Sequence, residues 1–372
     1  MENTNVITKK RDTNIELLRI VAMILVVSIH CISNGLVLYT QSINIYNGLI
    51  VKFMYGCSCV ANGVFLLLTG YYLVDKKINI KKIFNLWGKT WLYSVLIYII
   101  LSILDKDVQT FKSFMPILSC AYWFISAYIV LYLLSPILNI AINKMTKNQF
   151  KYILILLYIF YGIIRNFFDN QSIFQGDIPC VIMLYLTGAY VKNYVEIKQN
   201  QHYFIKYILL AVILALMNFI LNIFIKLDIN ETLKNILTTF TGKMWDYNNI
   251  LLIIMAGLLF MKFKTINITS KKLSNIITFI SPSVFSIYII HNNIHFHTLW
   301  RQDASLYMIH SPWLIPYLIF LIISVFVVCL LIDLLRRGIY HLLKKIPIIY
   351  KLVNKLNEKF EEVSLKLNSY IS

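Results

Sequence analysis

The sequence predicts an all-α fold, a polytopic membrane bundle of about ten transmembrane helices with both termini cytoplasmic. Hydrophobic residues make up 59% of the 372 residues and charged residues 14%, with a mean hydropathy of +0.69. Soluble domains carry about 25% charged residues. Apolar runs long enough to cross a bilayer recur along the chain, and Lys and Arg gather between alternate runs. The connecting segments are short, so any chemistry belongs to the helices or their loops.

The apolar runs give the predicted helices in order. The first follows Asn14, which we expect to be its N-cap. The eighth run, "NNILLIIMAGLLFMKF", is short and gives the weakest helix. The predicted spans are 14–36, 48–73, 84–104, 116–142, 151–168, 178–195, 205–225, 246–262, 276–298 and 313–335.

The placement of Lys and Arg predicts the orientation of this bundle. With ten spans and cytoplasmic termini, the inner segments hold 25 of the 35 Lys and Arg residues and the outer segments hold 8. Cytoplasmic loops of membrane proteins carry such an excess. The composition, rich in Lys, Ile and Asn, is typical of an A+T-rich bacterial genome, so we expect a multi-pass protein of the bacterial cytoplasmic membrane.

The chain is expected to divide into a membrane domain over 1–336 and a basic cytoplasmic tail over 337–372. In the tail, apolar and charged residues alternate at helical spacing. This pattern is typical of an amphipathic helix on a membrane surface, where it contacts membrane lipids. Anchoring explains the tail, although a further role stays open.

The net charge of +18 does not indicate nucleic acid as a partner, because no basic folded module is present to bind it. The six cysteines have no zinc-site spacing, and buried thiols explain them better than a disulfide. His291 and His295 are spaced i, i+4, but no Glu follows the first as the metalloprotease pattern requires. We therefore expect no metal.

Two segments, "VFLLLTGYYLVDKK" and "VIMLYLTGAYVKN", share the pattern L-T-G-x-Y. Gly70 and Gly188 lie near the inner ends of two predicted helices. Glycine at such a position permits close helix packing or a helix end. Convergent packing and a true internal repeat both explain the pattern.

Arg19 and His30 stand in the first predicted helix and call for an explanation, because ionisable residues in membrane spans are costly. They are 11 residues apart, which places both side chains on one helix face about 16 Å apart along the axis. Taken singly, Arg19 could reach the headgroups or pair with Glu16, and His30 could be a packing residue. Together on one face, they favour a functional site.

The segment "NIELLRIVAMILVVSIH" resembles the opening of the acyltransferase family 3 membrane proteins, which carry Arg, ten residues and His in their first helix. The segments "VFLLLTGYYL", "YWFISAYIVLYLLSPILN" and "FSIYIIHNNI" resemble further parts of that family, in the same order. The resemblance covers most of the chain. It implies transfer of an acyl group, usually acetyl from cytoplasmic acetyl-CoA, to a hydroxyl of a cell-surface glycan or lipid-linked sugar, such as capsule, exopolysaccharide or wall polymer. Residues 1–336 would then be the acyltransferase domain.

The resemblance gives Arg19 and His30 their expected roles. A neutral imidazole suits general-base catalysis near neutral pH, so His30 is the expected base, or a transient acyl carrier. Arg19 is the expected cation for the acyl-CoA donor or the developing oxyanion. No phosphate-binding loop and no serine-hydrolase elbow is present. The alternative from another class is a transporter of polysaccharide or a small solute, because buried charges also mark substrate pathways.

Other residues are candidates for the acceptor or for support of the site. Trp123 could stack on a sugar, although aromatic residues also form interfacial belts. Arg165 could hold an anionic acceptor or a lipid headgroup. His291 is the second candidate site histidine. The acceptor or supporting candidates are Glu16, Trp123, Ser126, Tyr128, Arg165, Tyr288 and His291, and the loop residues that could line the acceptor mouth are Asp169, Asp177, Asp246, Trp300, Arg301 and Asp303.

Overall fold

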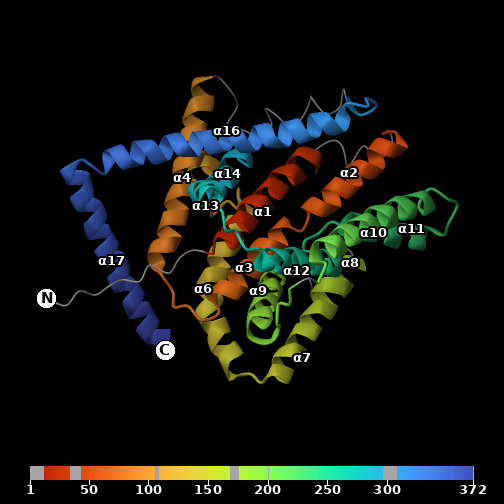
Figure 1. The fold of residues 1–372 in the computed structure, drawn as a ribbon, viewed down its shortest axis with the longest axis horizontal. Coiled ribbons are helices and arrows are strands. Elements are labelled where there is room, and N and C mark those ends of the chain that lie inside the picture. The colour runs from red at the N-terminus through yellow and green to blue at the C-terminus, as the bar shows by residue number, and fades with distance from the viewer. Residues whose placement is uncertain are drawn as a thin grey trace.

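The computed structural model describes residues 12–33, 43–104, 109–167, 176–199, 201–295 and 308–371, and these residues are helical with no strands. The predicted all-α class is therefore confirmed for this part of the chain (Figure 1). The first half contains α1 (Thr13–Ile32), α2 (Ile45–Ser58), α3 (Ala61–Leu73), α4 (Ile80–Ile103), α5 (Thr110–Phe114), α6 (Trp123–Lys144), α7 (Lys147–Leu157), a π-helical stretch (Tyr158–Ile164) and α8 (Arg165–Phe167). The second half contains α9 (Asp177–Tyr194), α10 (Tyr203–Phe224), α11 (Glu231–Lys243), α12 (Ile250–Thr265), α13 (Lys271–Ile280), a 3₁₀ turn (Ser281–Ser283), α14 (Val284–His291), α16 (Leu314–Leu343) and α17 (Pro347–Ile371).

Eight helical segments among the described residues are long and apolar enough to cross a membrane. They coincide with eight of the ten predicted spans. The other two predicted spans are also helical, as α9 and α12. α12 has 16 residues, about 24 Å of helix, which is shorter than a hydrocarbon core of about 30 Å. α9 carries Asp177 and Lys192 near its ends, and these lower its apolar character.

Several predicted boundaries are wrong, and local geometry explains each case. Asp12, rather than Asn14, is the N-cap of α1, and the Asn14 side chain instead donates to the Phe263 carbonyl. Residues 116–122 form turns, with Cys120 at a φ of 52°, so the helix there begins only at Trp123. The predicted 276–298 helix is interrupted by the turn at Pro282 and ends at His291.

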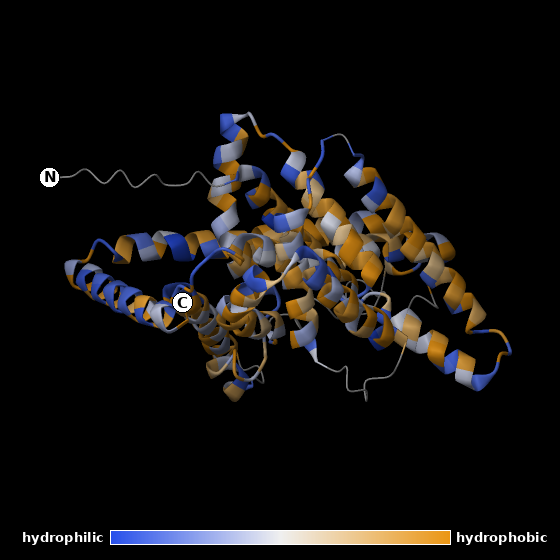
Figure 2. Cartoon of the chain, turned by 90° about the horizontal axis from the view of Figure 1, so that it is seen from below, coloured by the Kyte–Doolittle hydropathy of each residue, from blue (hydrophilic) through white to orange (hydrophobic). Residues whose placement is uncertain are grey.

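α1 is the central helix of the bundle. It contacts α2, α3, α12, α13, α14 and α16, and Figure 1 shows it crossing the middle of the molecule. More than half of its residues are buried in the bundle, and Arg19 and His30 are both partly buried. In Figure 2 hydrophobic colour dominates the bundle, whereas the helix that leads to the C-terminus is mostly hydrophilic. The fold thus places the first helix where a site between several helices can form.

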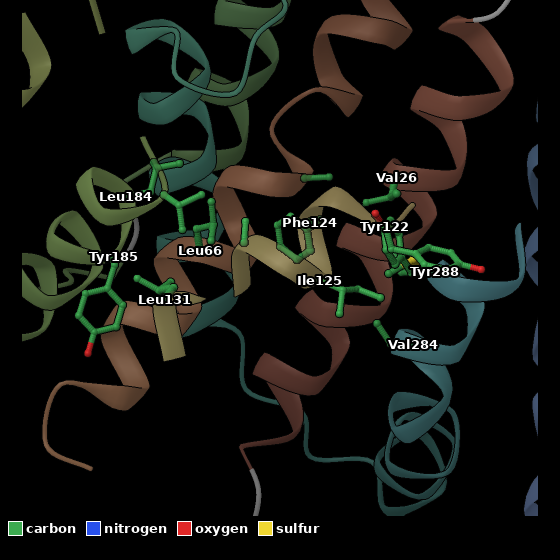
Figure 3. Close-up of a cluster of buried hydrophobic side chains, with 14 of the residues drawn as sticks. Val26, Leu66, Tyr122, Phe124, Ile125, Leu131, Leu184, Tyr185, Val284 and Tyr288 are labelled. Carbon is green, nitrogen blue, oxygen red and sulfur yellow. The ribbon is translucent and has the colours of Figure 1, made fainter. Parts of the chain in front are cut away.

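The two copies of the L-T-G-x-Y pattern pack against each other. A Cβ atom at Gly70 would overlap the carbonyl oxygen of Tyr185, and one at Gly188 would overlap that of Leu67. α3 and α9 therefore approach each other with backbone against backbone, as small residues permit in membrane helices. Figure 3 shows Leu184 and Tyr185 of α9 beside Leu66 of α3. Close packing explains both glycines.

α16 continues past the expected domain boundary at residue 337 and ends at Leu343. Arg336 and Arg337 do not end the helix, since Arg336 donates to Asp333 and Arg337 to the Phe279 carbonyl. The tail then forms the separate helix α17. Asn368 of α17 exchanges hydrogen bonds with the backbone of Ile78, at 3.0 and 2.9 Å. α17 thus packs against the segment that joins α3 to α4.

Candidate functional site

His30 and His291 form the centre of the site. Nδ1 of His30 lies 2.9 Å from Nε2 of His291, although 261 residues separate them. His30 stands in the last turn of α1 and His291 at the end of α14, where it is fully buried. The structure therefore brings together the first and second candidate histidines.

Hydrogen bonding orients the His291 ring and defines its tautomer. Nδ1 of His291 lies 2.6 Å from the carbonyl oxygen of Ile287. A carbonyl oxygen only accepts, so this nitrogen carries a proton. Nε2 of a neutral His291 is then an acceptor, and the contact with His30 requires the Nδ1–H of His30 as donor. Nε2 of a neutral His30 is consequently the atom with the basic lone pair.

A cavity of about 390 Å³ opens beside the N-terminal half of α1. Arg19, Lys76 and Lys82 line it, and no carboxylate belongs to its described lining. We call it the basic cavity. It extends to Val26, which lies one helical turn before His30. Figure 3 shows four residues that line it, Val26 of α1, Phe124 of α6, and Val284 and Tyr288 of α14, in the same part of the bundle.

Arg19 has two kinds of contact. Its Nη1 lies 2.9 Å from Oε1 of Glu16, which is buried, and the Arg19 side chain remains 40% exposed. The Arg19–Glu16 ion pair, which is the structural explanation for Arg19, is therefore present. Arg19 also lines the basic cavity, so pairing with Glu16 fixes the guanidinium at the cavity wall.

A second cavity, of about 310 Å³, lies beside the C-terminal end of α1. Its described lining contains two carboxylates and no Lys or Arg, so we call it the acidic cavity. Ile29, which precedes His30, belongs to its wall. The lining residues are Ile29, Tyr55, Cys59, Asn62, Trp123, Asp177, Trp245, Asp246 and Tyr247.

The two cavities adjoin each other inside the bundle. Asn62 lines both of them. Trp123 lines the acidic cavity and its neighbour Phe124 the basic one. The interruption between α2 and α3 occurs here, at Cys59 and Val60. Irregular backbone at membrane depth is tolerated where it is buried in protein or lines a cavity.

Of the remaining candidates, two line the basic cavity, whereas Ser126 and Arg165 line neither cavity. Tyr128 and Tyr288 line the basic cavity, and the Tyr288 ring lies 6.1 Å from that of His291. Ser126 does not line either cavity, because its hydroxyl donates to the Ile117 carbonyl at 2.8 Å. Arg165 contacts the Gly176 carbonyl and the Cys180 sulfur, and its Nη2 lies 3.6 Å from Asp177.

Of the predicted mouth residues, Asp177 and Asp246 line the acidic cavity. The others, Asp169, Trp300, Arg301 and Asp303, lie outside the described residues. His295 contacts the Ser113 hydroxyl at 3.1 Å. The described part of the chain holds no His, Cys, Asp or Glu cluster suited to a metal ion, and no disulfide joins the six cysteines, all of which are described.

Sequence reasoning did not find several lining residues. By sequence position Lys76 and Lys82 belong to a basic segment between two predicted helices, whereas in the structure they line the basic cavity. Trp245 and Tyr247 flank Asp246 in the triplet "WDY", at the start of the eighth predicted span. In the sequence, this alternation of aromatic and acidic residues is the pattern that could have indicated an acceptor site.

Comparison with known proteins assigns the family. A family model described as an acyltransferase domain matches residues 12–333. No curated protein and no solved structure matches the chain. The matched residues include α1 with Arg19 and His30, α14 with His291, and all described residues that line the two cavities. The chain therefore belongs to acyltransferase family 3 and is a membrane acyltransferase.

Proposed function

We propose that this acyltransferase moves an acetyl group from cytoplasmic acetyl-CoA to a hydroxyl of an extracytoplasmic carbohydrate. The observation that supports this most directly is the pair of adjoining cavities of opposite charge at the two ends of α1. A donor that enters from one side and an acceptor from the other would meet beside Asn62. The proposal includes the predicted orientation, with both termini on the cytoplasmic side of a bacterial membrane.

The basic cavity suits acyl-CoA as donor. Coenzyme A carries several phosphate charges, and Arg19, Lys76 and Lys82 line this cavity without an opposing carboxylate in its described lining. A volume of about 390 Å³ lies within the range of about 300–1,000 Å³ typical of ligand pockets. We place the pantetheine arm and acetyl thioester inside it and the nucleotide at its mouth.

The histidine pair supplies the proton transfer. Nε2 of His30 takes the proton of the acceptor hydroxyl while the hydroxyl oxygen attacks the thioester carbonyl carbon. The tetrahedral intermediate then collapses, the carbon–sulfur bond breaks, and the CoA thiolate takes the proton from the imidazolium of His30. His291 accepts a hydrogen bond from Nδ1–H of His30 throughout and holds the ring in place. Atoms and charge balance without a further reactant.

The transporter alternative is not favoured, because the family match concerns an acyltransferase domain. The test uses inverted membrane vesicles that contain the full chain and enclose surface glycan, with radiolabelled acetyl-CoA added outside. We expect label in the glycan for the wild type and a loss of at least 100-fold for His30→Ala. His341→Ala, which changes an exposed histidine of α16, is the matched control.

Two results would contradict the proposal. Equal label with His30→Ala would exclude His30 as the base. An absence of label in the wild type, together with passage of glycan or solute across the membrane, would instead support transport.

A further inference from the structure

The composition of the acidic cavity indicates which class of acceptor it can bind. Aromatic rings and carboxylates form most of its wall, and the described lining holds no Lys or Arg. This composition differs from that of a site for phosphate or carboxylate ligands, which proteins bind with Arg, Lys or backbone N–H groups.

The aromatic side chains form two pairs. Trp123 and Tyr247 are stacked, with ring centroids 5.5 Å apart and an interplanar angle of 22°. Trp245 and Tyr55 meet edge to face at 5.5 Å. The face of an aromatic ring carries partial negative charge and the edge partial positive charge. Such a face attracts the C–H groups of a sugar ring, which carry partial positive charge, but offers nothing to an anion.

The carboxylates line the cavity, whereas their cationic partners do not and are less exposed. Asp177 is 48% exposed, whereas Arg165, whose Nη2 lies 3.6 Å away, is 16% exposed. Asp246 is 40% exposed, whereas Lys243, at 3.7 Å, is 19% exposed. Tyr247 donates a hydrogen bond to Asp177 at 2.8 Å. The cations thus position the carboxylates rather than the acceptor.

These contacts leave acceptor capacity on both carboxylates. An ionised carboxylate has about four lone-pair sites, and the structure uses part of them for Arg165, Tyr247 and Lys243. Sugar hydroxyl groups are donors of the matching kind. A uronate or phosphate placed in the same space would face two like charges without a cation in the described lining.

We infer that the acidic cavity is a subsite for an uncharged or amino-sugar unit of the acceptor and that Asp177 and Asp246 exclude acidic sugars from it. This inference rests on the proposed function for the identity of the pocket as the acceptor site. Arg165, one of the candidate anion-binding residues, becomes a positioning residue for Asp177. Trp123 and Trp245 provide the apolar faces.

The test measures sugar binding without acetyl-CoA, so its result does not depend on catalysis. The full chain in lipid nanodiscs is titrated with three disaccharides, N,N′-diacetylchitobiose, its diamino counterpart and digalacturonate. We expect the neutral and amino disaccharides to bind at least tenfold more tightly than digalacturonate. Asp177→Asn and Asp246→Asn keep the side-chain shape. Each should reduce the preference over digalacturonate at least threefold, and the preference for the diamino sugar should fall most strongly.

Tryptophan substitutions distinguish binding in the acidic cavity from a general effect of replacing a tryptophan. Trp245→Ala should weaken binding of the neutral disaccharide at least tenfold, and Trp245→Phe less. Trp313→Ala, which changes a tryptophan that is 69% exposed, should leave the binding of the neutral disaccharide unchanged.

Three results would overturn the inference: equal or tighter binding of digalacturonate, an unchanged preference over digalacturonate in both Asn variants, or no binding of any of the three sugars. Failure of label transfer with intact sugar selectivity would instead count only against the proposed acetyl transfer.

Discussion

In the proposed reaction the two histidines have different tasks. His30 handles the proton of the acceptor hydroxyl, and His291 accepts a hydrogen bond from its other ring nitrogen at 2.9 Å. The Ile287 carbonyl fixes His291 in turn. A base oriented by a second group, itself oriented by a third, is the arrangement by which enzymes keep a general base in one tautomer.

Replacing His291 separates these tasks. We expect His291→Phe to reduce kcat about 100-fold, in line with the loss of general-base catalysis, with little change in KM for acetyl-CoA. His291→Gln offers an amide oxygen as acceptor and should retain more activity than His291→Phe. The measurement is initial-rate kinetics of acetyl transfer. Equal kcat for both variants would mean that the hydrogen bond has no positioning role.

The cations of the basic cavity should act on the donor alone. Lys76→Gln combined with Lys82→Gln is expected to raise KM for acetyl-CoA about threefold to tenfold, because exposed charge pairs contribute up to about 1 kcal/mol each. The change in kcat should be small, since such contacts bind substrate and transition state alike. Added salt should reduce the difference. Lys351→Gln on an exposed position of α17 is the control, and an equal effect there would count against a donor contact.

At the scale of elements, interruptions in helices coincide with the cavities. The break between α2 and α3 lies at Cys59, in the wall of the acidic cavity, and the turn between α13 and α14 places Ser281 and Pro282 in the wall of the basic cavity. Next to them, α3 and α9 are in backbone contact at Gly70 and Gly188. Close packing beside irregular segments gives the cavity walls a fixed frame.

The close contact between α3 and α9 predicts the effect of adding one methyl group at Gly70. Gly70→Ala forces the new Cβ against the Tyr185 carbonyl, so we expect a loss of stability of about 1–3 kcal/mol, as for overpacked cores. The thermal midpoint of the purified protein in detergent is the measurement. Gly257→Ala on α12 is the matched control, because a Cβ there would meet no atom within 4 Å apart from its own helix backbone and chain neighbours. An unchanged midpoint for Gly70→Ala would show that α3 and α9 can separate at little cost.

At the scale of the whole molecule, composition and helical periodicity predicted most of the fold. Among the described residues each of the ten apolar runs contains a helix, and Arg19 and His30 could be placed on one face from their spacing alone. The contact of His30 with His291 could not be predicted from spacing, since it depends on how α1 and α14 pack. The same holds for Lys76, Lys82 and Trp245, which reach the cavities through tertiary structure.

The orientation of the molecule can be tested with its own cysteines. Cys120 is the exposed cysteine, and it precedes α6 at the end of the bundle where Tyr122 accepts a hydrogen bond from Asn293. With cytoplasmic termini this end faces outward. We expect a membrane-impermeant maleimide to modify the wild type in intact cells and not Cys120→Ser. Modification only after the membrane is opened would reverse the predicted topology.

The meeting of the two cavities at Asn62 has an energetic consequence. In the proposed reaction the hydroxyl proton moves inward to coenzyme A, while the acetyl group moves outward as the equivalent of an acyl cation. The two charges cancel, so acceptor and donor each keep their net charge and every turnover is electroneutral. Moving one net charge through the full potential would be worth about 2.3 kcal/mol per 100 mV, and this exchange neither uses nor stores that energy. Vesicles with a voltage-sensitive dye would measure this, and a potential that develops during turnover would mean that a proton crosses separately from the acetyl group.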